Sequence, residues 1–199
     1  MRTLFILFML GCPFAGISQN NTYIVNGKFP AEHAHLTLSY NKGNNTHIRE
    51  EADVIGGKFT FKGTIDAPYK VYLIASYPGA KGKDYDDHLE FFLDAGTTNI
   101  QTADSLKNAT LSGTRLVADG LAYDKPMTEL FTILSKEYET REKSATEDEK
   151  KTESYKQTMA AIDDSFLVQQ KRMNLAFIHA HPDSRMNLYI FREQTSTAV

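Results

Sequence analysis

The sequence predicts an α+β protein, in which an antiparallel β-sandwich or open barrel of about eight strands is followed by an amphipathic helical segment. From Thr22 to about Arg115, short runs of Tyr, Val, Ile, Phe and Thr alternate with period two between Gly, Asn, Asp and Pro clusters. After Arg115 the apolar residues recur at helical spacing. Strands followed by helices, rather than alternating with them, are typical of the α+β class.

The first residues have the pattern of a secretory signal peptide. Met1-Arg2-Thr3 precede an apolar run from Leu4 to Leu10, which is too short to span a bilayer. Small residues then offer a cleavage site after Ser18. We therefore expect residues 1–18 to be removed, and the protein to be exported to the periplasm or attached to the envelope of a Gram-negative bacterium.

An alternative route is lipoprotein processing at Cys12. The run Met9-Leu10-Gly11-Cys12 loosely matches the pattern in which a cysteine after a small residue becomes the lipidated N-terminus. Contact with a membrane is expected only by this route. Cys12 is the single cysteine of the chain, so cleavage after Ser18 would leave no sulfur nucleophile, disulfide or thiolate ligand.

The charge balance argues against nucleic acid and anionic lipid as general partners. The chain carries 22 basic and 25 acidic residues, for a net charge of −3. Loss of a leader that contains only Arg2 would leave 21 basic and 25 acidic residues, a net charge of −4. Such a surface does not attract polyanions.

Residues 19–115 are predicted to form the β-rich accessory domain. Leu36, Leu38 and Tyr40 alternate with polar neighbours, which indicates one dry and one wet face of a strand. Phe59 and Phe61 continue this pattern in a later strand. The expected inward-facing residues are Leu36, Leu38, Tyr40, Phe59, Phe61, Gly63 and Ile65.

Glycines mark the expected turns. Gly56-Gly57 suits a two-residue hairpin, because both positions of such a turn favour positive φ angles. Asp94-Ala95-Gly96 predicts a second turn of this kind. The stretch from Pro78 to Asp87, with two glycines and several charges, predicts a mobile loop.

Residues 116–199 are predicted to be a helical segment. Asp124 and Pro126 predict the start of a first helix, and a capping box at Thr146 and Glu149 predicts the start of a second. Residues 141–152 between them are either a linker or a solvated length of one continuous helix. The apolar stripes are Met127, Leu130, Phe131, Leu134 and Tyr138, then Tyr155, Met159, Ile162, Phe166, Met173 and Phe177.

Chemistry-bearing residues are few. His33 and His35 would share one strand face and could both reach a metal ion, but two ligands are fewer than a site needs, so they are weak metal candidates. The run His181-Pro182-Asp183-Ser184 is better explained as the end of one helix and the cap of the next. The sequence lacks a Cys-x-x-Cys pair and the usual nucleophile and dinucleotide motifs. We therefore expect no cofactor and no catalytic residue.

Several runs together resemble a known family. They are Tyr23 to Gly27, Gly57 to Gly63, Phe91 to Gly96, Leu111 to Thr114 and the turn His181 to Ser184. In this order they resemble the N-terminal domain of unknown function that precedes the thioredoxin-like domain in exported thiol-disulfide oxidoreductases of the AhpC/TSA, TlpA and ResA type.

The resemblance implies a periplasmic setting and a redox-associated parent protein. The reactive Cys-x-x-Cys would lie on a domain beginning after about residue 200, so no catalytic residue carries over to these 199 residues. Whether the chain acts as an enzyme is open, and by itself it is expected not to. It is either part of a longer protein or a stand-alone relative.

Three functions follow from these observations. The first is a non-catalytic accessory domain that binds a partner or ligand, with its own thioredoxin-like domain, another protein or a second copy docking on the helices. The second is a positioning role within a thiol-disulfide oxidoreductase. The third is a stand-alone periplasmic sandwich that binds carbohydrate or a small ligand through Tyr69, Tyr72, Tyr77 and Tyr85.

Overall fold

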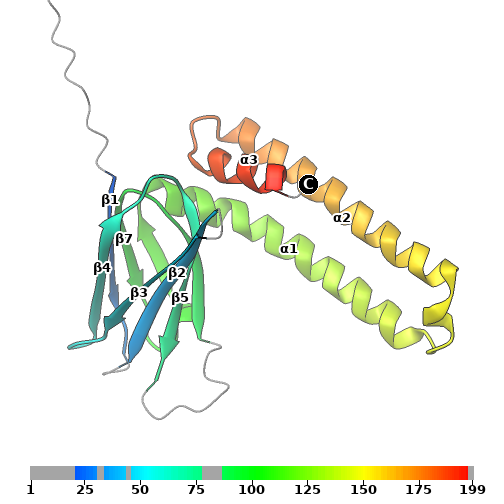
Figure 1. Ribbon diagram of the computed structural model, residues 1–199, viewed down its shortest axis with the longest axis horizontal. Helices are drawn as coiled ribbons and strands as arrows, with labels where there is room; N and C mark the ends of the chain where they lie inside the picture. Colours follow the sequence, from blue (N-terminus) through cyan, green and yellow to red (C-terminus); the bar gives the residue numbers. More distant parts are fainter. Residues whose placement is uncertain (1–20, 31–33, 44–45, 78–86, 197–199) are drawn as a thin grey trace, which may run out of the picture.

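The computed structural model describes residues 21–30, 34–43, 46–77 and 87–196 (Figure 1). A β-sandwich lies at one end, and two long helices project from it with a shorter helix beside their base. The strands are β1 (Thr22–Lys28), β2 (His35–Gly43), β3 (Thr46–Asp53), β4 (Lys58–Thr64), β5 (Tyr69–Ser76), β6 (His88–Leu93), β7 (Gly96–Gln101) and β8 (Thr110–Gly113).

The eight strands of the described residues form two four-stranded sheets. One sheet has the order β4-β1-β7-β8 and the other has the order β3-β2-β5-β6. All neighbours are antiparallel except β1 and β7, which run parallel with Tyr23 opposite Gly96. The predicted α+β class and sandwich are therefore confirmed, with one parallel pairing in place of a fully antiparallel arrangement and no closed barrel.

The core lies between the two sheets and follows the predicted alternation. Leu36, Leu38 and Tyr40 are buried, as are Phe59 and Phe61. Their burial explains why the period-two pattern was readable, since successive side chains of a strand point to opposite faces.

Thr37 is an exception to the expected wet face, because it is buried. The guanidinium of Arg49 on neighbouring β3 lies close to it, and its Nη2 donates to the Thr37 hydroxyl at 3.4 Å. A long side chain from an adjacent strand therefore helps to cover a position that the alternation alone assigns to solvent.

The glycine turns have the predicted backbone but connect the two sheets. Gly56 and Gly57 have φ of +58° and +69°, and Gly96 has φ of +115°. The turn at Gly56 and Gly57 is bridged only between Ile55 and Lys58, because β3 and β4 belong to different sheets. The expected hairpins are thus corrected to inter-sheet connections, because the strands on the two sides of each turn pair within different sheets, which a turn signal cannot reveal.

The first helix, α1 (Arg115–Ser144), begins earlier than expected. Its N-cap is Thr114, whose hydroxyl accepts a hydrogen bond from the backbone N–H of Val117 at 3.4 Å. The predicted start at Asp124 and Pro126 is wrong, since Pro126 lies inside the helix. Burial of the first turn of α1 against the sandwich stabilises the helix. The helix therefore forms although a proline inside it is unfavourable.

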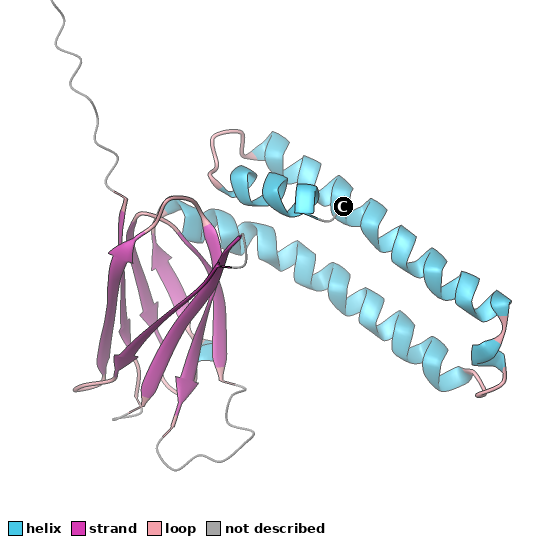
Figure 2. Cartoon of the chain, viewed as in Figure 1, coloured by secondary structure: helices cyan, strands magenta, loops and turns pink. Residues whose placement is uncertain are grey.

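The second helix, α2 (Glu153–Ala180), begins later than the capping box. Thr146 and Glu149 do exchange the expected hydrogen bonds, at 2.7 and 3.3 Å. These bonds lie at the start of a short 3-10 turn, η3 (Glu149–Lys151), and not at the start of α2. Thr152 is the N-cap of α2 itself. The stretch from 141 to 152 is therefore the end of α1 followed by a tight reversal, and α1 and α2 form an antiparallel pair (Figure 2).

The second helix ends where predicted. Its last residue is Ala180, directly before His181 and Pro182. Ser184 then accepts a hydrogen bond from the N–H of Met186 at 3.2 Å, at the start of α3 (Met186–Ser196). None of the helices within the described ranges has the length and apolar character needed to cross a membrane.

Candidate interaction surface

The helices are attached to the sandwich through a small apolar cluster that is separate from the sandwich core. Phe92 projects from β6 into this cluster, and its ring lies 4.8 Å from that of Tyr189 on α3. Gly120 allows the close approach of α1, since a Cβ added there would lie only 2.5 Å from Phe92 Cδ2. The buried members of the cluster are Phe92, Leu116, Phe177, Met186 and Ile190.

Polar contacts fix the same junction. Arg185 Nη1 donates to Asp94 Oδ1 at 2.6 Å, which ties the start of α3 to the turn after β6. Ser184 donates to Asp119 Oδ2 at 2.5 Å, with both residues buried. The His181 ring stacks on Phe177 at 4.5 Å. The run from His181 to Ser184 therefore ends α2 and caps α3 as predicted. Ser184 also ties the start of α3 to α1, and the adjacent Arg185 ties it to the sandwich.

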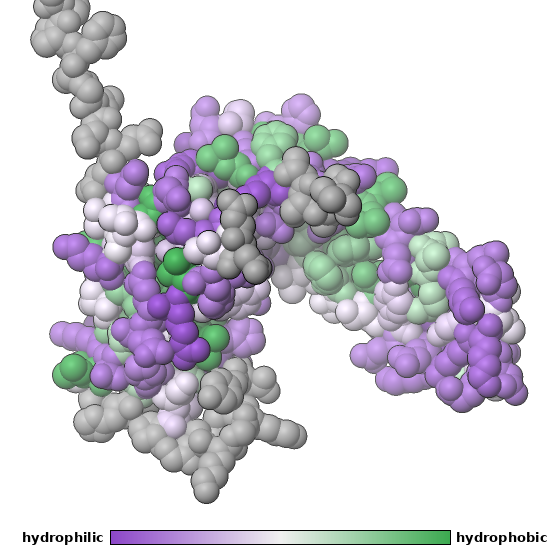
Figure 3. Space-filling view, viewed as in Figure 1, coloured by the Kyte–Doolittle hydropathy of each residue, from purple (hydrophilic) through white to green (hydrophobic). Residues whose placement is uncertain are grey.

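Beyond this junction the helix pair is sparsely packed. Among the described residues between Thr128 and Met173, Ile162 alone is buried. Phe131 and Ile133 on α1 are 49% and 66% exposed. Apolar atoms gather between α1 and α2 on the face seen in Figure 3. The predicted apolar stripes are therefore present, but they only partly bury each other.

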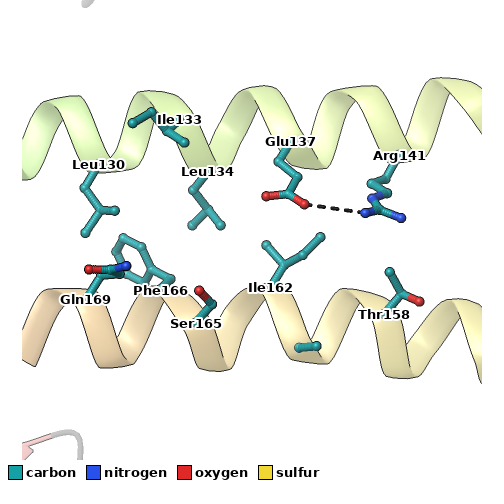
Figure 4. A pocket seen from close by; sticks show the side chains of 11 residues that line it. Leu130, Ile133, Leu134, Glu137, Arg141, Thr158, Ile162, Ser165, Phe166 and Gln169 are labelled. Carbon is teal, nitrogen blue, oxygen red and sulfur yellow. Dashed lines mark ion pairs between the residues drawn. The ribbon is translucent and has the colours of Figure 1, made fainter.

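A groove of about 460 Å³ lies between the two helices (Figure 4). Leu130 and Leu134 extend from α1 toward α2, and Ile162 and Phe166 extend from α2 toward α1. The ring centres of Phe131 and Phe166 lie 4.8 Å apart. The full lining is Leu130, Ile133, Leu134, Glu137, Arg141, Thr158, Ala161, Ile162, Ser165, Phe166 and Gln169.

The charged groups of the groove stand at one end and pair with each other. Arg141 Nη2 lies 3.6 Å from Glu137 Oε1 on the next turn of α1. Nearby, the Tyr138 hydroxyl donates to Asp163 of α2. Six of the eleven lining residues are apolar, and the two charged ones pair with each other. This chemistry suits an apolar side chain of a partner better than a charged small molecule.

A second hollow, of about 250 Å³, lies between the outer face of the β2-β5 sheet and α3. Tyr72 is exposed and lines it, together with Lys70, His47 and Arg192. Lys70 Nζ also forms an ion pair with Glu90 at 2.8 Å. This hollow has the mixed polar and aromatic lining that a small polar ligand would need.

Of the four tyrosines predicted to bind a ligand, the structure describes three, and they are not gathered at this hollow. Tyr69 is buried, and the guanidinium carbon of Arg192 lies 4.7 Å from the centre of its ring. Tyr77 is half-buried and donates to Asp87. Tyr85 lies outside the described residues. Among the three described tyrosines of this set, Tyr72 alone lines the hollow.

Burial also perturbs groups near the base of α1. Desolvation raises the pKa of Tyr123 to about 12, and Asp124 and Glu193 add to this effect. Desolvation likewise raises the pKa of Asp124, which Lys70 opposes. These shifts belong to the contact between helix and sheet, because Tyr123 donates to Asn174 of α2 at 2.9 Å and packs against Phe92.

The predicted metal and lipidation residues are only partly placed. His35 Nδ1 lies 2.8 Å from Asp53 Oδ1, and its Nε2 lies 3.3 Å from Glu51 Oε2. His33 and Cys12 lie outside the described residues, as do residues 1–18 and most of the predicted loop from 78 to 87. Within the part of the chain that is described, no group of three or more His, Cys, Asp or Glu side chains could hold a metal ion.

Sequence reasoning identified the helical stripes but not the groove or the contacts at the junction. No sequence motif includes Asp94, Asp119 or Arg185. Their contacts depend on how the helices pack back against the sheet. The sequence signal that could have indicated these contacts is a capping serine, Ser184, followed directly by an arginine, Arg185, just after the predicted end of a helix.

Comparison with known proteins bears on the sandwich. No match to the chain is found among curated proteins. A family model matches residues 23–119, from the first core tyrosine to Asp119 near the start of α1. This range holds nearly all of the two sheets and only the beginning of the helices. The expected resemblance to a domain of unknown function is thereby confirmed: the β-sandwich of this chain matches the family described as Domain of unknown function (DUF4369).

Proposed function

We propose that this chain is a non-catalytic accessory module of an exported, thioredoxin-like thiol-disulfide oxidoreductase. In this proposal the sandwich supports the helix pair, and the groove between α1 and α2 receives an apolar segment of the thioredoxin-like domain. The observation that carries the proposal is the apolar groove on helices that bury little of their own surface. Export and the thioredoxin-like parent rest on the leader pattern and on the resemblance of the sequence.

The groove has the properties of a protein-binding site. Contiguous exposed apolar surface on a folded protein commonly marks an interaction site. Helix pairs that leave a hydrophobic groove bind amphipathic segments by inserting apolar anchors. Ile133 at the rim and Leu134 below it would contact such anchors, and the Glu137–Arg141 pair would border them.

The test is binding of a purified thioredoxin-like domain from an exported oxidoreductase of this type, measured by calorimetry. Ile133→Glu places a charge in the groove and is expected to weaken binding at least about tenfold, since desolvating an unpaired carboxylate is costly. Ile55→Glu is the matched control, because Ile55 is 77% exposed on the sandwich and distant from the groove in the chain.

Two outcomes would contradict the proposal. One is the absence of binding by the unaltered chain at high micromolar concentrations. The other is an equal loss of affinity in Ile133→Glu and Ile55→Glu, which would show that the groove has no special part.

A second candidate function is binding of a small polar ligand in the hollow beside Tyr72. The observation in its favour is the convergence of Tyr72, Lys70, His47 and Arg192 around about 250 Å³. A panel of oligosaccharides tested by thermal shift addresses it. A saturable shift that Tyr72→Ala abolishes would support this function, and no shift with any sugar would remove it.

A further inference from the structure

The face of α2 that points away from the groove carries a second apolar stripe. Asp164, Val168, Lys171 and Leu175 follow the i, i+4, i+7, i+11 spacing that places residues on one side of a helix. Val168 and Leu175 are 58% and 56% exposed, so the stripe is open to solvent at least as far as Leu175. Leu167, also exposed, borders it.

The charges on this stripe are arranged symmetrically about its apolar centre. Asp164 lies three positions before Leu167, and Lys171 lies three positions after Val168. A two-fold axis between Leu167 and Val168 would therefore place Asp164 of one copy opposite Lys171 of an antiparallel copy. The same axis places Leu175 opposite Ala160, so that a large side chain meets a small one.

Asp164 and Lys171 form no ion pair within the described part of the chain, although other charges of the helical segment, such as Glu139 and Lys143 on α1, do pair. Asp163, by contrast, already accepts the hydroxyl of Tyr138. Asp164 and Lys171 are thus available to an outside partner, and their spacing suits a copy of the same helix.

We infer that α2 is a self-association surface, on which a second copy of this chain packs antiparallel about an axis between Leu167 and Val168. Two symmetric Asp164–Lys171 pairs flank the contact of Leu167 with Val168. A parallel arrangement is disfavoured, because it places Asp164 beside Asp164 and Lys171 beside Lys171.

The axis falls near the middle of α2, which spans residues 153–180. The stripe from Ala160 to Leu175 is about 22 Å long at 1.5 Å per residue. A contact of this length is at the small end of specific interfaces, so we expect a dimer with micromolar affinity rather than an obligate one. This inference is independent of the proposed groove function, since Ile162 and Phe166 occupy the opposite face of α2.

Charge reversal tests the arrangement without disturbing the fold, because both side chains are exposed. Asp164→Lys alone puts two Lys–Lys pairs in the dimer, and Lys171→Asp alone puts two Asp–Asp pairs there. Each variant is expected to self-associate about tenfold more weakly in sedimentation equilibrium. An equimolar mixture of the two variants regains both opposite-charge pairs and is expected to form heterodimers with the original affinity.

The matched control is Glu129→Lys, an exposed reversal on α1 that should leave association unchanged. Three results would overturn the inference: a chain that stays monomeric at hundreds of micromolar, single reversals that dimerise as well as the unaltered chain, or a mixture that associates no better than its components. Because the groove is on the other face, Ile133→Glu is expected to keep the dimer, so failure of either proposal can be recognised separately.

Discussion

At the scale of single residues, Tyr23 connects the two sheets. It is fully buried in β1, and its hydroxyl donates to Glu50 of β3 in the opposite sheet at 2.5 Å. Burial raises the pKa of Tyr23 far above its usual range, and the hydrogen bond to Glu50 adds to this, so the hydroxyl stays a donor. Gly63 leaves it room, since a Cβ there would lie 2.7 Å from the hydroxyl oxygen.

Tyr23→Phe is expected to lower the free energy of unfolding by about 1–3 kcal/mol, because Glu50 would lose its buried donor. Urea denaturation measures this loss. The double variant Tyr23→Phe/Glu50→Leu removes both partners and should recover much of the stability. A single variant as stable as the unaltered chain would show that the hydrogen bond contributes nothing.

His35 makes a small part of the stability pH-dependent. The hydrogen bond to Asp53 is the main cause that raises the pKa of His35, partial burial opposes it, and Glu51 adds to it. A folded-state pKa above the unfolded value means that the contribution is fully present below about pH 6.5 and is lost as pH rises through the folded value. Because the side chain is 41% exposed, we expect only a few tenths of a kcal/mol.

The measurement compares unfolding free energies near pH 5.5 and near pH 8.5, on either side of the ordinary histidine pKa. His35→Gln should remove part of the fall in stability between the two conditions. An identical pH dependence in His35→Gln and the unaltered chain would rule out this role of the ion pairs.

At the scale of elements, the strands were predictable and the helix start was not. Strand alternation is local, because each side chain of β2 or β4 reports its own face. The start of α1 depends on the burial of Leu116 and Val117, of which Leu116 joins the cluster around Phe92, and no window of sequence around Pro126 contains that information. The groove could not be predicted from the sequence either, because it depends on the distance between the two helices.

Gly120 sets the distance between α1 and β6. In Gly120→Ala the new Cβ would lie 2.5 Å from Phe92 Cδ2, so the helix or the ring must shift. We expect a loss of about 1–3 kcal/mol from overpacking, even though alanine favours helix over glycine by about 1 kcal/mol. Thermal unfolding measures the loss, and Gly120→Ala/Phe92→Leu should recover part of it. A stabilised single variant would contradict the close contact.

At the scale of the whole molecule, stability is unevenly distributed. The sandwich has a continuous core, whereas the outer parts of α1 and α2 bury little. Among the helices and strands of the described residues, hydrogen exchange should therefore be slowest in β2 and β5 and fastest around residues 130–165, since local opening follows the density of buried contacts. Uniform protection across strands and helices in dilute solution would contradict this expectation.

The parallel pairing of β1 with β7 has a consequence for the order in which the protein assembles. As the chain emerges from the ribosome, Tyr23 appears long before its partner Gly96. The sheet of β2, β3, β5 and β6 can close first, because its strands lie between those two residues. Until β7 arrives, β1 exposes an open edge of backbone donors and acceptors, and such edges recruit other chains. The nascent protein therefore passes through a stage at which a holding chaperone would have a β-strand edge to shield.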